Sequence, residues 1–298
     1  MRVFRCSSIL LAVSSAVLAQ DIPAAVTADP PRDAKYPATT VVAAIASGDA
    51  TINGLLYVAA GAGPHPTLLL LHGLPGNEQN LDLAQAVRRA GWNVLTMHYR
   101  GSWGSGGTFS FEHAAEDVHA ALAWLRVPAN AAKGRIDVAR IAVAGHSFGG
   151  MLAAVTGAAD TKLAGVAMIS AWNLGGFAAW ARARGEQGRA SFVQAMVDNR
   201  EALAGCTPQG LADEALGSGA KWDFLTCAAA LAGRPLLLLS SDDGNGPQSD
   251  ELGKRIRAAG GKAVTALALP TDHSYSDHRI ALAAAVVRWL DSLPVPPK

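Results

Sequence analysis

The stretch that decides the fold is Gly145-His146-Ser147-Phe148-Gly149, a Gly-x-Ser-x-Gly pentapeptide. The preceding residues, 140–144, are largely apolar with β-branched side chains at alternate positions, which is typical of a buried strand. The following residues, 150–155, begin an apolar helix. A strand that turns directly into a helix forms a tight elbow and exposes the hydroxyl of the serine at its tip. Ser147 is therefore predicted to be a nucleophile; the alternative is a turn of small residues that permits tight packing.

The composition suits one compact domain. The chain has 298 residues, of which 50% are hydrophobic and 16% are charged, and its net charge is +1. This length allows one α/β domain with a sizeable core and a modest insertion. Because no basic block is present, nothing in the charge pattern favours a nucleic-acid partner.

The N-terminus has the pattern of an export signal. Two arginines lie within the first five residues, an apolar run covers 9–18, and small residues then favour cleavage after Ala19, with Ala16 as the alternative. The run is far shorter than the roughly 20 residues that span a bilayer. Residues 1–19 are predicted to be a signal peptide, and the mature chain is expected to be periplasmic or secreted, without a membrane span.

Two cysteines remain after Cys6 leaves with the signal. An oxidising compartment would permit a disulfide between Cys206 and Cys227, and closing that loop would stabilise the fold by roughly 3 kcal/mol. The alternative is two small, buried, apolar side chains. The sequence leaves both open.

The periodicity predicts an α/β fold over residues 41–298, preceded by an extended leader over 20–40. Strands alternate with helices, so the sheet should be mostly parallel, of an eight-stranded type, with helices on both faces. The first two strands should form a hairpin. Strands are expected at 41–45, 51–59, 67–71, 92–98, 140–144, 163–170, 236–240 and 263–269, and helices at 78–90, 112–125, 148–157, 250–259 and 277–293.

One segment interrupts this alternation. Residues 171–230 separate two strands by far more than a crossover needs, and they are rich in aromatic residues. The segment is interpreted as a helical cap inserted over the edge of the sheet. Trp172 and Trp180 of the cap, and Trp103 in the glycine-rich stretch 101–107, are candidates for lining a substrate pocket, although core packing is an alternative for each.

A serine hydroxyl needs a base, and the base needs an orienting group. In parallel sheets such groups follow the carboxyl ends of strands. The strand at 236–240 is followed by Asp242 and Asp243, and the strand at 263–269 is followed by His273. Asp243 is favoured as the acid because Gly244 would allow a sharp turn after it, while Asp242 stays an alternative. His273 is favoured as the base over His278.

Two backbone N–H groups would stabilise a developing oxyanion. One is expected from Phe148, in the first turn of the helix after Ser147, and the other from the loop after the strand at 67–71. Pro75 has no N–H, so Leu74 is the favoured donor and Gly76 the alternative.

Residues 65–293 resemble the α/β-hydrolase superfamily. The matching pieces are the His72-Gly73 loop, the elbow at Ser147, and the late Asp243 and His273. Two further motifs are similar to the dienelactone-hydrolase and prolyl-oligopeptidase-like branch, namely Tyr99-Arg100-Gly101-Ser102 with Gly104, and Glu116-Asp117-Val118 leading to Trp124-Leu125. Dienelactone hydrolases have a cysteine in place of Ser147, and prolyl oligopeptidases carry a large propeller domain that the leader here is too short to form.

The residues and the resemblance together predict a serine hydrolase that cleaves small to medium carboxylic esters. A peptidase with the same machinery is one alternative, and a catalytically silent binding protein is another. An acyltransferase would share every residue named.

No cofactor is expected, because stretch 101–107 lacks the dinucleotide-binding spacing. No metal is expected either, since one helix holds several candidate ligands without a complete ligand spacing: Glu112, His113, Glu116, Asp117 and His119. Physiological substrate and oligomeric state are not predicted.

Overall fold

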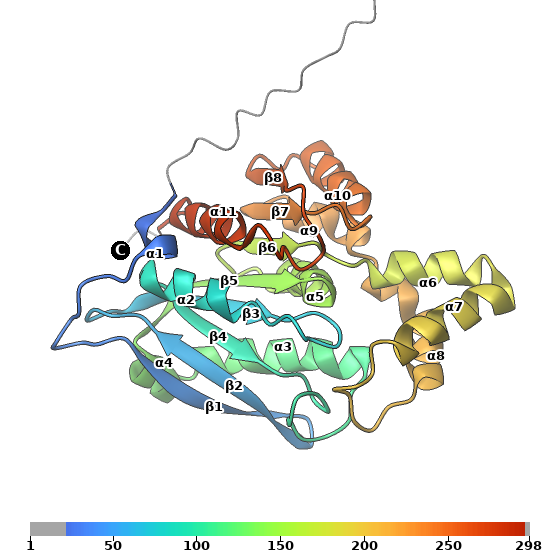
Figure 1. Ribbon diagram of the computed structural model, residues 1–298, viewed down its shortest axis with the longest axis horizontal. Helices are drawn as coiled ribbons and strands as arrows, with labels where there is room; N and C mark the ends of the chain where they lie inside the picture. The colour runs from blue at the N-terminus through green and yellow to red at the C-terminus, as the bar shows by residue number, and fades with distance from the viewer. Residues whose placement is uncertain (1–21, 296–298) are drawn as a thin grey trace, which may run out of the picture.

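The structure, a computed structural model, describes residues 22–295. The predicted signal peptide and Cys6 lie outside the described residues. The described chain forms one eight-stranded sheet in the order β1-β2-β4-β3-β5-β6-β7-β8 (Figure 1). The strands are β1 (Thr39–Ser47), β2 (Ala50–Val58), β3 (His65–Leu71), β4 (Asn93–Met97), β5 (Ile136–His146), β6 (Val166–Ile169), β7 (Leu236–Ser240) and β8 (Val264–Ala268).

The pairing confirms the predicted mostly parallel sheet. The strands β1 and β2 form the expected antiparallel hairpin, turning at Gly48, and β2 pairs antiparallel with β4. From β4 to β8 every pair is parallel. The carboxyl ends of β3, β5, β7 and β8 therefore lie along one edge of the sheet, where the predicted site residues follow them.

Both faces of the sheet are covered, because the central strands are apolar on both sides. In β3, Leu68 and Leu70 belong to one buried cluster, while Leu69 and Leu71 belong to the other. This alternation explains the run of four leucines, which a strand exposed on one face could not carry. The first cluster includes side chains of α2 and α11, and the second includes those of α3, α5 and α10.

The helices agree with most of the expected ranges. Helix α4 is an addition: Pro128 stands in its first turn and Arg135 ends it in a left-handed conformation. The helices are α1 (Ala24–Thr27), α2 (Leu81–Arg89), α3 (Phe111–Arg126), α4 (Pro128–Gly134), α5 (Phe148–Ala159), α6 (Leu174–Arg182), α7 (Gly185–Val197), α8 (Pro208–Ser218), η2 (Gly219–Trp222), η3 (Phe224–Cys227), α9 (Ala228–Leu231), α10 (Gly246–Ala258) and α11 (Arg279–Asp291).

The segment 171–230 is helical, as the cap interpretation requires. Figure 1 shows α6, α7 and α8 grouped at one end of the molecule, on the right of the view. The segment 202–204 after α7 returns to the main domain, where Leu203 forms a β-bridge with Ser102. No helix between residues 22 and 295 is long and apolar enough to cross a membrane.

The leader differs from the extended segment that we expected. It contains one helical turn, α1, which packs against α2 and α11. The guanidinium of Arg89 donates hydrogen bonds to the carbonyls of Ala25 and Val26, at 2.6 and 3.2 Å. These bonds tie the leader to the main domain.

The two motifs of the dienelactone-hydrolase-like branch meet each other in the core. The carboxylate of Asp117 is fully buried and accepts hydrogen bonds from the Arg100 backbone N–H at 2.6 Å and from Arg100 Nε at 2.7 Å. The hydroxyl of Ser47 donates a third bond to it at 2.6 Å. A buried charge needs such partners, so these motif residues hold β1, α3 and the loop after β4 together.

Candidate active site

Ser147 lies at the tip of a sharp turn between β5 and α5. Its φ is 56° and its ψ is −119°, a conformation that a residue with a side chain rarely adopts. The turn is possible because glycines flank it: a Cβ on Gly145 would lie 2.0 Å from the carbonyl oxygen of Gly149. A Cβ on Gly149 would lie 2.6 Å from the carbonyl oxygen of His72. The elbow predicted from the pentapeptide is therefore present.

His273 and Asp243 meet at the same edge of the sheet. His273 Nδ1 donates a hydrogen bond to Asp243 Oδ2 at 2.6 Å. The Asp243 side chain is only 6% exposed, whereas that of His273 is 39% exposed. Nδ1 of His273 is therefore held by a buried carboxylate, while another part of the ring is open to solvent.

Two groups of Asn245 complete the environment of the Asp243 carboxylate. The Asn245 backbone N–H donates to Oδ1 at 2.8 Å, and its side-chain amide donates to Oδ2 at 3.2 Å. Burial alone would raise the pKa of Asp243, but the hydrogen bonds from His273 and Asn245 outweigh burial and lower the pKa to about 2. Asp243 is therefore ionised at neutral pH.

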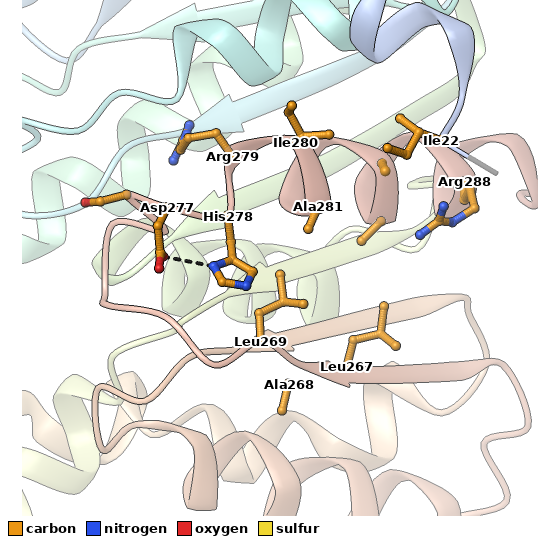
Figure 2. A pocket seen from close by; sticks show the side chains of 13 residues that line it. Ile22, Leu267, Ala268, Leu269, Asp277, His278, Arg279, Ile280, Ala281 and Arg288 are labelled. Carbon is orange, nitrogen blue, oxygen red and sulfur yellow. Dashed lines mark hydrogen bonds and ion pairs between the residues drawn. The ribbon is translucent and has the colours of Figure 1, made fainter. Parts of the chain in front are cut away.

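The alternatives to these two residues lie elsewhere. Asp242 is exposed, and its backbone N–H bonds to Thr271, while Gly244 has the positive φ, 85°, that the predicted turn requires. His278 is at one end of a second cavity, between β8 and α11, as Figure 2 shows. There its Nδ1 bonds to Asp277 at 2.9 Å. This cavity of about 450 Å³ is lined mainly by apolar side chains and does not include Ser147.

Ser147, His273 and Asp243 line one cavity of about 400 Å³. The cap contributes much of its wall, from α6, α7 and their flanks. The remaining lining residues are mostly apolar, and none of those described carries a full charge: Leu74, Trp172, Phe177, Ala195, Met196, Asn199 and Asn245.

Of the three tryptophans proposed for the pocket, Trp172 lines this cavity, while Trp103 and Trp180 do not. Trp180 is 39% exposed, stacks on Phe177 with ring centroids 5.3 Å apart, and carries the Arg184 guanidinium over its ring. Trp180 therefore packs behind Phe177, which itself lines the cavity.

Trp103 instead supports the loop that carries Leu74. Its indole N–H donates to the carbonyl of Pro75 at 2.7 Å, and its backbone N–H donates to Ala202 of the cap connection at 3.3 Å. It holds a positive φ of 48° to do so. Trp103 thus joins two segments that border the site rather than facing the cavity.

The loop after β3 passes directly beside the elbow. A Cβ on Gly73 would lie 3.0 Å from Ser147 Cβ and 3.5 Å from Ser147 Oγ. Leu74, next along the loop, lines the cavity, while Gly76 has a φ of 96° and lies against the ring of His72. Phe148 starts α5, where the first N–H groups of a helix have no partner within the helix. Leu74 and Phe148 therefore lie beside Ser147, and their role as oxyanion donors stays a prediction.

Sequence reasoning missed one further neighbour of His273. His146 is buried, its ring centroid lies 4.6 Å from that of His273, and its Nε2 lies 2.8 Å from the His273 carbonyl oxygen. The residue is in the pentapeptide, but its contact spans 127 positions in sequence. Only the prediction that both loops share one edge of the sheet could have suggested it.

The two cysteines do not form the disulfide that was considered. Both are free thiols. Cys227 belongs to η3, which packs against α5 and α10, whereas Cys206 follows the cap connection close to Arg200 and Glu214. Both cysteines pack in or against the same apolar cluster as small side chains, the alternative that the sequence left open, and burial raises the pKa of each thiol.

Four of the five candidate ligands on α3 have structural partners. Glu112 pairs with Lys221, and Glu116 and Asp117 pair with Arg100. The ring of His113 bonds to the carbonyl of Thr108 at 2.8 Å. These contacts account for the three carboxylates and for His113 as part of the fold, while His119 is exposed.

The site geometry fits nucleophilic catalysis by a hydroxyl. Such catalysis needs a hydroxyl on a strained turn, an imidazole as base and a buried carboxylate that orients the imidazole. Ser147, His273 and Asp243 come from the loops after β5, β8 and β7, and they supply these three groups to one cavity.

The family model BD-FAE matches residues 59–172, which is less than half of the chain. The span contains Leu74, Trp103 and Ser147 and ends before Asp243 and His273. No curated protein sequence matches the chain.

Solved structures show the fold more completely. A thermostable carboxylesterase cloned from a metagenomic library is 21% identical, with a TM-score of 0.63, covering 91% of this chain and 92% of that one. The enol-lactonase from Burkholderia xenovorans LB400 is 18% identical, with a TM-score of 0.59 and coverages of 85% and 100%. The acylaminoacyl peptidase of Pyrococcus horikoshii is 16% identical with a TM-score of 0.62, and the match covers 88% of this chain but 42% of that one. The chain therefore has the α/β-hydrolase fold, in agreement with the resemblance seen in the sequence.

Proposed function

We propose that this chain is a serine hydrolase that cleaves carboxylic esters through an acyl-enzyme intermediate. The observation that carries the proposal is the meeting of Ser147, His273 and Asp243 in one cavity, with Ser147 on a strained elbow. These residues come from three separate loops, and packing alone does not require a serine, an imidazole and an ionised carboxylate there.

In the proposed reaction, Ser147 Oγ attacks the ester carbonyl while His273 Nε2 takes its proton. The C–O bond to the alcohol then breaks, and His273 returns the proton to the leaving oxygen. Asp243 keeps Nδ1 protonated and supports the imidazolium through the 2.6 Å bond. The backbone N–H groups of Leu74 and Phe148 would stabilise the oxyanion, each contributing about 3 kcal/mol. A water molecule then attacks the acyl-enzyme through the same steps, with His273 again taking and returning the proton, and Ser147 is released.

The cavity lining supports an uncharged substrate. Apart from His273 and Asp243, its described walls are apolar side chains and two asparagines. An acyl or alcohol group with a charge would lose hydration there without gaining a partner. The volume of about 400 Å³ suits small to medium groups.

Replacing Ser147 with Ala tests the proposal. The variant should lose about 10⁶ in kcat on a nitrophenyl ester, because the remaining groups cannot form the acyl-enzyme. Hydrolysis by the wild-type protein together with full activity of the variant would end the assignment.

A peptidase is the second candidate, since the acylaminoacyl peptidase shares the fold. The same assay with matched ester and amide substrates separates the two: a higher kcat/KM for the amide, corrected for intrinsic reactivity, would favour the peptidase.

A further inference from the structure

His146 makes two contacts with the histidine that the proposed mechanism uses as its base. Its Nε2 is 2.8 Å from the backbone carbonyl oxygen of His273, and its ring packs on the His273 ring with centroids 4.6 Å apart at 43°. A carbonyl oxygen only accepts, so Nε2 must carry the proton. This bond therefore fixes the tautomer of His146.

The surroundings of His146 keep its ring neutral. The side chain is 4% exposed, and burial lowers its pKa to about 4, with the nearby His273 as a second cause. The hydrogen bond to the His273 carbonyl opposes this shift, as does the charge of Asp243, while Arg279 lowers the pKa further. Nδ1 is buried and has no hydrogen-bond partner among the described residues. Burying a polar ring costs free energy that the hydrogen bond of Nε2 offsets in part.

The position of His146 in the chain makes these contacts informative. It is the last residue of β5 and is bonded directly to Ser147, so the backbone that places the nucleophile also carries His146. The loop of His273 is also held by Tyr275, whose hydroxyl bonds to Ser170, and by Arg279, which donates to the carbonyl of Ser274. The bond from His146 directly joins the base loop to the elbow.

We propose that His146 is a positioning residue, which fixes the base loop against the elbow so that the imidazole of His273 stays in register with the hydroxyl of Ser147. The inference rests on the proposed function and adds a role for the residue before the nucleophile. Loss of this register should reduce the chemical step more than substrate binding, because His146 is outside the cavity lining.

Three substitutions separate the hydrogen bond from packing. His146→Gln places an amide N–H where Nε2 stood. His146→Asn carries the same amide, but its side chain is one methylene shorter than that of glutamine. His146→Phe keeps a ring and has no hydrogen-bond donor. His278→Gln is the matched control, because His278 lines the second cavity. Each protein is assayed for kcat and KM on a nitrophenyl ester and for its rate of labelling by a fluorophosphonate.

His146→Phe and His146→Asn should lose about 10- to 100-fold in kcat and in labelling rate, with KM changed by less than about 3-fold. His146→Gln should keep most of the wild-type kcat, and His278→Gln should match the wild type. If His146→Phe does not fold, the Gln and Asn variants decide between the outcomes. Free energies of unfolding at pH 7 identify losses that come from instability.

Equal kcat values for the Gln and Asn variants, or wild-type kcat in the Phe variant, would overturn the positioning role while leaving the proposed function intact. A wild-type protein that neither reacts with the fluorophosphonate nor hydrolyses the ester would remove both. Loss confined to KM would also contradict the role, since it would place His146 in substrate binding.

Discussion

Ser147 holds a backbone conformation that costs about 1–3 kcal/mol relative to ordinary regions. The backbone around it is tightly packed, because the Cβ positions of Gly145 and Gly149 are filled by backbone atoms. The fold therefore maintains strain at the residue whose hydroxyl lines the cavity. Residues that only pack seldom need such a conformation, and this is the residue-level reason to regard Ser147 as functional.

The acid of the site can be tested residue by residue. Asp243→Asn should lower kcat by about 10⁴-fold, because an amide cannot hold the imidazole with Nδ1 protonated. Asp242→Asn should stay within about 3-fold of the wild type, since that side chain is exposed. Steady-state kinetics on a nitrophenyl ester measures both. A loss in Asp242→Asn with full activity in Asp243→Asn would reverse the assignment.

The sequence was sufficient to place the three site residues in loops after strands, because chain order and strand ends are local features. The choice between Asp242 and Asp243 rested on the glycine at 244, and its positive φ bears out that reasoning. His146 and Asn245 were missed. Their hydrogen bonds depend on which way a side chain points at the end of β5 or in the loop after β7, and no local pattern fixes that direction.

At the scale of elements, the buried strands were the most predictable. Runs such as Leu68–Leu71 are apolar on both faces, so their composition alone is enough to predict that they are buried in the core. Helix α4 was overlooked, although proline at its start and glycine at its end, Pro128 and Gly134, are recognised boundary signals. Its seven residues carry no clear apolar period because most of them face solvent.

The orientation of the aromatic rings in the cap could not be predicted from single helices and strands. Its aromatic content was visible, but which rings face the cavity depends on how α6 and α7 pack across the elbow. Trp172 faces it, and Trp180 stacks behind Phe177. Trp103 is outside the cap, yet it joins the cap connection to the loop of Leu74 through Ala202 and Pro75. Tertiary packing decides each of these roles.

At the scale of the whole molecule, buried histidines make stability depend on pH. Burial lowers the pKa of His72 and of His146 to about 4 each, against 6.5 when exposed, and it also lowers that of His98. The unfolded chain therefore takes up protons below pH 6.5 that the native protein does not bind. The stabilisation is fully present above pH 6.5 and is lost as the pH falls toward 4.

The free energy of unfolding should consequently fall by about 4 kcal/mol between pH 7 and pH 5, from His72 and His146 together. Denaturant titrations at several pH values measure this change. His146→Gln should show about half of the change that the wild type shows in that range. A stability that is flat from pH 7 to pH 5 would contradict the burial of these rings as neutral groups.

The whole fold brings together groups that are distant in sequence, from the loops after β5, β7 and β8, and the proposed chemistry depends on that convergence. The most direct measurement treats the folded protein with a fluorophosphonate and locates the adduct by mass spectrometry of its peptides. We predict one adduct, on Ser147, formed in the wild type and absent from Ser147→Ala and from the denatured wild type. An unmodified Ser147, or an adduct that forms equally in the unfolded chain, would contradict the account.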